Sequence, residues 1–104
     1  MDALRYIIII MALTKTTVED KIEVVGDYKH IQVRTATVIK EDDTELSRSF
    51  HRKILTPGTL DGSDNLVDTD TSSESTEVKG IASTVWTTDV KNAWKARLIA
   101  TKPS

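Results

Sequence analysis

The chain contains no cysteine, only two prolines and four glycines, and aromatic residues make up 5% of its 104 residues. Without cysteine there is no disulfide framework, no thiol chemistry and no Cys-based zinc site, so stability must come from packing or from partners. The hydrophobic fraction of 38% is also low, which predicts a small core and modest burial on folding. A chain of this length forms one domain, or one domain with tails.

Neither sign of charge predominates, since 14 basic and 16 acidic residues leave a formal net charge of -2. Such a balance gives no overall attraction for nucleic acid or for an anionic membrane, although it leaves room for a local patch. No residue spacing matches a phosphate-binding loop, a nucleophile elbow or a metal site. We therefore expect a protein that is not an enzyme and that uses no cofactor and no metal.

The one long apolar run lies near the N-terminus, from Ile7 to Leu13. It is far shorter than the ~20 residues that a membrane-spanning helix needs. A signal peptide is disfavoured because Asp2 lies in the n-region and no small-x-small cleavage site follows. Two interpretations stay open for residues 1–12: they contain an extra strand at 4–12, or they are an N-terminal extension, with the biological start at Met11 and residues 1–10 upstream of it.

Residues 13–57 predict an antiparallel sheet, with strands at 16–25, 30–40 and 45–55 whose apolar residues alternate with polar ones. We expect two-residue turns at Gly26-Asp27 and Asp42-Asp43 to join these strands into a three-stranded meander. Both turns place the same apolar set on one inner face: Val18, Ile22, Val24, Ile31, Val33, Ile39, Leu46, Phe50 and Ile54.

Two arginines, Arg48 and Arg52, share the parity of that inner face and do not fit it. They are expected to lie at the sheet margin, to extend toward solvent or to meet a carboxylate. Both histidines, His30 and His51, fall on the outer face, where we interpret them as solvated strand residues rather than as catalytic or metal-binding groups.

The second half predicts an acidic polar loop at 58–72, followed at 73–104 by two helices of the same single domain. The helices are expected at 73–86 and 89–100, with Ser73 or Ser75 as competing caps for the first. They would form a second layer over the apolar sheet face, giving an α+β fold with Trp86 and Trp94 at the contact. Within the loop, Asp61 to Asn65 resembles a calcium loop only superficially, because the EF-hand spacing is missing.

Four cations are the candidate interaction residues: Arg34, Arg48, Arg52 and Lys53. The locally basic stretch 48–53 also contains Phe50, and a strand with cations and an aromatic can contact phosphate and stack on a base. The expected register, however, divides these cations between two faces. Nucleic-acid binding is therefore the alternative hypothesis and not the leading one.

The stretch 14–58, which contains TTVEDKIEVVGDYKHIQVRTATVIKEDDTELSRSFHRKILTPG, resembles small uncharacterised proteins of tailed phages that infect marine cyanobacteria. The later GIASTVWTTDVKNAWKARL is similar to the end of the same group. The likeness begins at about Met11, which favours the later start, and it rests on no functional motif.

The resemblance implies a phage protein located in the virion or the host cytoplasm. The leading hypothesis is a structural or accessory virion component that self-associates as a homo-oligomer or docks to another phage structural protein. The alternative is a host-takeover module that contacts nucleic acid or a host regulator. Neither hypothesis involves a membrane.

Overall fold

The structure is a computed structural model that describes residues 13–103. Both interpretations of the N-terminal segment, the extra strand at 4–12 and the start at Met11, concern residues outside this range. The elements in chain order are β1 (Leu13–Val25), β2 (His30–Glu41), β3 (Thr44–Leu55), β4 (Gly58–Leu60), β5 (Leu66–Asp68), α2 (Thr76–Val85) and α3 (Thr88–Ala100).

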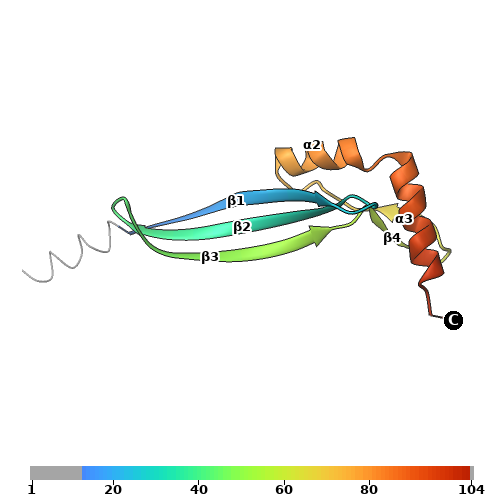
Figure 1. Cartoon of the computed structure of the whole chain (residues 1–104), viewed down its shortest axis with the longest axis horizontal. Coiled ribbons are helices and arrows are strands. Elements are labelled where there is room, and N and C mark those ends of the chain that lie inside the picture. Colours follow the sequence, from blue (N-terminus) through green and yellow to red (C-terminus); the bar gives the residue numbers. More distant parts are fainter. Residues whose placement is uncertain (1–12, 104) are drawn as a thin grey trace, which may run out of the picture. The chain divides into compact units, whose positions relative to one another are not determined.

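The predicted α+β fold with a three-stranded antiparallel sheet is confirmed, with the strands in the order β1-β2-β3 (Figure 1). The two-residue turn at Asp42-Asp43 is present between β2 and β3. The first turn is longer than predicted, because it spans Gly26 to Lys29, whose N–H donates to the Gly26 carbonyl at 3.2 Å. Two additional residues preserve the parity of the pairing, so this difference does not change the faces of the strands.

The described chain divides into two compact units, one of residues 13–21 and 34–52 and one of residues 22–33 and 53–103. We call the first the sheet unit, since it contains strand residues and the Asp42-Asp43 turn. We call the second the helical unit, since it contains both helices and the β4-β5 ribbon.

The core of the helical unit forms where α2 packs on β2. Its buried members are Ile31, Val33, Val78, Ala82 and Trp86. The spacing of four residues along α2 places Val78, Ala82 and Trp86 on one side of the helix. The indole N–H of Trp86 donates to the backbone carbonyl of Lys29 at 2.7 Å, so its polar atom is satisfied while the ring is buried. The predicted position of Trp86 at the contact between helix and sheet is confirmed.

Each helix begins at a hydroxyl cap. Ser75, one of the two competing candidates, caps α2 by accepting the Val78 N–H at 3.3 Å. Thr87 caps α3 by accepting the Val90 N–H at 3.3 Å. These bonds satisfy N–H groups that the first turn of a helix leaves without a partner.

A short β-ribbon, β4-β5, lies inside the segment that we expected to be a loop. Gly58 pairs with Asp68 and Leu60 with Leu66. Helix α3 packs against β4, where the indole N–H of Trp94 donates to the Gly58 carbonyl at 2.8 Å. Helix α3 thus packs on the ribbon, and it also contributes Val90 to the packing around Ile31 and Val33.

The predicted inner face is confirmed at the start of β2 and at Ile22 of β1, which is partly buried against the same core. Ile31 and Val33 are buried, but the next buried positions of the strand are Ala36 and Val38, which have the opposite parity. A shift of one residue in the alternation is typical of a β-bulge, and it transfers the following side chains to the other face. Most of the predicted inner-face residues are exposed: Val18, Val24, Ile39, Leu46, Phe50 and Ile54.

Candidate interaction surface

The most prominent feature of the sheet unit is an exposed apolar pair on β3. Leu46 is 54% exposed and Phe50 is 52% exposed. Residues four apart on a strand point to the same side, so the two side chains share a face. Phe50 is the only phenylalanine of the chain. Large apolar groups of this kind are normally covered, and two on one strand face mark a candidate contact surface.

Phe50 is braced by Arg34 of the central strand. The guanidinium carbon of Arg34 lies 4.4 Å from the centre of the Phe50 ring, a cation–π contact. The same guanidinium donates two hydrogen bonds to Asp20 of β1, at 3.0 and 2.8 Å. The hydrogen bond from Arg34 is the main reason that the pKa of Asp20 lies below its usual value. We call Arg34, Leu46 and Phe50 the Phe50 patch.

The other candidate cations are not gathered at this patch. Arg48 donates to both carboxylate oxygens of Glu45, at 2.8 and 3.3 Å. This hydrogen bonding lowers the pKa of Glu45 and raises the pKa of Arg48. Arg48 therefore meets a carboxylate, one of the three outcomes expected for an arginine of this parity. Arg52 is exposed on β3.

Lys53 has a structural partner in the helical unit. Its ammonium lies 2.6 Å from Oε1 of Glu74, whose side chain is only 8% exposed. The contact is an ion pair without the geometry of a directed hydrogen bond. Three of the four predicted interaction residues thus contact carboxylates of the chain itself, and only Arg34 also contacts an exposed aromatic ring.

The interpretation of His30 as a solvated residue is wrong. Its Nε2 is buried and has no hydrogen-bond partner among the described residues. The imidazole meets the Trp94 ring edge to face, with centroids 4.8 Å apart, and Tyr28 lies 5.3 Å from the same indole. Period-two patterning could not show this contact because Trp94 comes from α3, far along the chain. His51 is exposed, as expected.

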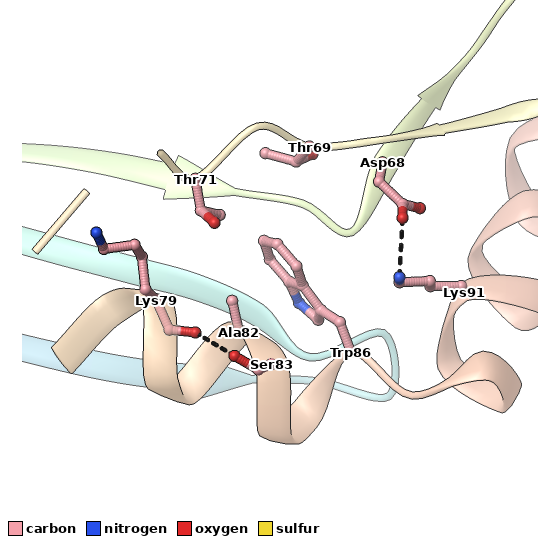
Figure 2. A pocket seen from close by; sticks show the side chains of 8 residues that line it. All are labelled: Asp68, Thr69, Thr71, Lys79, Ala82, Ser83, Trp86 and Lys91. Carbon is pink, nitrogen blue, oxygen red and sulfur yellow. Dashed lines mark hydrogen bonds and ion pairs between the residues drawn. The ribbon is translucent and has the colours of Figure 1, made fainter. Parts of the chain in front are cut away.

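The helical unit also has a polar hollow of about 220 Å³ beside Trp86. Figure 2 shows the indole ring between Ala82 on one side and Thr69 and Thr71 on the other, with Lys79 and Lys91 at opposite ends. The Lys91 ammonium is 3.0 Å from an Asp68 carboxylate oxygen.

Two of the three hydroxyl groups that line this hollow donate to backbone carbonyls. Ser83 donates to the Lys79 carbonyl at 2.7 Å, and Thr69 donates to the Thr56 carbonyl at 2.6 Å. No histidine or cysteine lines the hollow. Neither hydroxyl has the adjacent base that an activated nucleophile requires.

The acidic loop uses its aspartates for local structure. Asp61 accepts the N–H groups of Ser63 and Asn65 at 2.8 and 2.9 Å, with the bond from Asn65 contributing most to the lowered pKa of Asp61. Asp64 pairs with Lys102 at 2.5 Å. Between residues 13 and 103, no group of three metal-ligating side chains is found. In the same range no helix has the length and apolar character needed to cross a membrane.

No protein-family model, no curated protein and no solved structure matches this chain. The resemblance to cyanobacterial phage proteins therefore stays a prediction.

Proposed function

We propose that the protein is a small non-enzymatic component that works by protein–protein contact, either with further copies of itself or with a larger protein. Together with the sequence resemblance, a function through protein–protein contact suggests a structural or accessory role in a phage virion. The observation that carries the proposal is the Phe50 patch, in which two large apolar side chains are about half exposed and one is braced by an arginine.

The composition of the patch suits a contact that contributes strongly to binding. Aromatic residues and arginine are enriched among the residues that dominate interface energetics. Complete burial of a Leu or Phe side chain is worth about 1.5–3 kcal/mol, so covering the exposed half of Leu46 or Phe50 is worth roughly 1 kcal/mol each. Arg34 is already held by Asp20, which reduces the entropy lost when a partner orders the surface.

The sheet offers a second means of contact through its edges. In the order β1-β2-β3, the outer strands are β1 and β3. An edge strand presents backbone N–H and C=O groups that can pair with a strand of another chain. Edge pairing beside the Phe50 patch would combine backbone hydrogen bonds with burial of apolar side chains.

The nucleic-acid alternative is less well supported by the same residues. Arg48 and Lys53 contact Glu45 and Glu74, so these cations are already partly neutralised. Phosphate binding would have to replace contacts with carboxylates that the fold supplies. A salt-dependent gel shift that weakens in R48A or K53A would favour this alternative, and the lack of any shift at low salt would remove it.

The proposal is tested by light scattering and sedimentation at micromolar concentration, with binding to phage particles measured alongside. F50S and L46S should reduce association while leaving the folded state intact, because both side chains are exposed. V67S is the matched control, since Val67 is 51% exposed on β5, outside the patch. A strict monomer that also fails to bind phage particles would contradict the proposal, as would an equal effect of V67S.

A further inference from the structure

The helical unit carries an open apolar groove between the end of β1 and helix α2. Its volume is about 520 Å³. Ile81 and Val85 pack on the core of this unit and also line the groove, and Val24 on the opposite wall is 42% exposed. Gly80 leaves space in the middle, since a Cβ there would meet nothing within 4 Å. We call this surface the α2 groove, and its lining residues are Val24, Thr76, Glu77, Gly80, Ile81, Thr84 and Val85.

We propose that the α2 groove of one copy of this chain receives the Phe50 patch of a second copy. This inference rests on the proposed function, which leaves open whether the partner is a further copy or another protein. It adds the identity of the partner and the surface that meets the patch.

The size and the apolar walls of the groove suit the two apolar side chains of the patch. Leu46 and Phe50 are each more than half exposed and point to the same side of β3. A cavity of about 150 Å³ with apolar walls is sufficient to bind benzene. A groove of about 520 Å³ therefore has room for the Phe50 ring together with the Leu46 side chain. Because both surfaces are exposed within one copy, the cover must come from a partner.

One cation and one carboxylate favour a second copy over an apolar partner without charge. Arg52 follows Phe50 by two residues on β3, so it points to the same side as the ring. Glu77 is the one charged residue among the described residues that line the groove. Both side chains are exposed, and neither has an ion pair or a hydrogen bond within residues 13–103. Arg34 and Arg48 already contact carboxylates, which leaves Arg52 to meet Glu77 of a second copy.

Such a contact joins two different surfaces, so it does not close after two copies. One patch and one groove stay uncovered in a dimer, and copies add until a ring closes or a filament grows. A twofold dimer differs, because the same surface would then serve both partners.

Exchange of the two charges tests the contact in the full chain. R52E and E77R should each weaken association about fivefold in sedimentation at micromolar concentration, because each variant places like charges together. A mixture of the two variants should recover association, since the R52E patch then meets the E77R groove. The double variant R52E/E77R should recover it for the same reason. If the mixture and the double variant stay as weak as the single variants, the two residues are not in contact and the arrangement is wrong.

Filling the groove tests the receiving surface without weakening the fold. G80L places a side chain in the open space of the groove and replaces glycine with a better helix former. It should associate at least tenfold more weakly while remaining as stable to urea as the wild type. S83L is the matched control, because Ser83 is exposed on the same helix and lines the polar hollow instead. Unchanged association of G80L, or an equal loss in S83L, would contradict the groove as the receiving surface.

The outcomes separate this inference from the proposed function. If copies associate but neither G80L nor the charge exchange has an effect, the arrangement is wrong and self-association stands. A chain that stays monomeric at tens of micromolar but binds phage particles refutes the second copy as partner and leaves the proposed function intact. Loss of that particle binding in G80L would then assign the groove to another protein.

Discussion

Replacement by alanine should change the free energy of unfolding in opposite directions at Gly58 and at Gly80. Gly58 begins β4, and a Cβ placed there would lie 2.5 Å from the Val67 carbonyl oxygen and 3.0 Å from the Leu66 Cγ. The first contact is with backbone of the paired strand, so it cannot be relieved by a side-chain rotation. Gly80 lies inside α2, and a Cβ there would meet nothing within 4 Å.

The magnitudes follow from these surroundings. G58A must push β5 away from β4 and disturb the hydrogen bond from Trp94 to the Gly58 carbonyl, which we expect to cost about 1–3 kcal/mol. G80A removes conformational freedom from the unfolded chain and adds a better helix former, which should stabilise the protein by about 0.5–1 kcal/mol. For a domain of this size 1 kcal/mol corresponds to a Tm change of roughly 4–8 °C.

Urea unfolding followed by tryptophan fluorescence measures both changes, since Trp86 and Trp94 lie in the unit that contains these glycines. The expected result is a lower midpoint for G58A and a higher midpoint for G80A, with similar slopes. If G58A is as stable as the wild type, the close approach of β4 and β5 is not present in solution. If G80A lowers the midpoint, the space beside Gly80 of α2 is not open in solution.

Three further perturbations test other contacts. W86F removes the indole N–H that donates to the Lys29 carbonyl and part of a buried ring, and chemical denaturation should show a loss of about 1–3 kcal/mol. K53M removes the cation beside the nearly buried Glu74 carboxylate and should lower the free energy of unfolding by about 1–3 kcal/mol. The neighbouring control R52M should change it by no more than roughly 0.5 kcal/mol. Equal effects of the two variants would rule out a specific ion pair. The hydrogen bond from Arg34 lowers the pKa of Asp20, so this carboxylate stabilises the folded state above the ordinary carboxyl pKa, and that stability is lost as the pH falls through the lowered pKa. D20N should therefore flatten the acid limb of a curve of stability against pH. An unchanged limb would contradict the pairing of Asp20 with Arg34.

Patterning was sufficient to predict the elements with strong periodicity. The three long strands, the Asp42-Asp43 turn and both helices follow from alternation, turn residues and hydroxyl caps such as Ser75 and Thr87. The β4-β5 ribbon was not predicted from the sequence, because its strands have three residues each, too few for alternation to be visible. The ribbon is held instead by its pairing and by the Trp94 hydrogen bond, which are tertiary contacts.

The site was predicted less well than the fold, for a related reason. Arg34 was a candidate as a surface cation, but its contact with Phe50 was not predicted, because the expected register placed Phe50 on the inner face of the sheet. A single register from turn to turn would place Leu46 and Phe50 in the core. All residues of β3 before Leu55 are exposed, so the apolar parity of this strand does not mark a buried face.

The mismatch between pattern and burial is itself the best argument for a binding role. Val18, Leu46 and Phe50 have the spacing of residues on a covered strand face, yet each is at least 44% exposed among the described residues. A sheet surface that faces only water has no physical need for large apolar groups at every fourth position, and such groups promote aggregation. Their presence on both edge strands is accounted for if the cover is another chain.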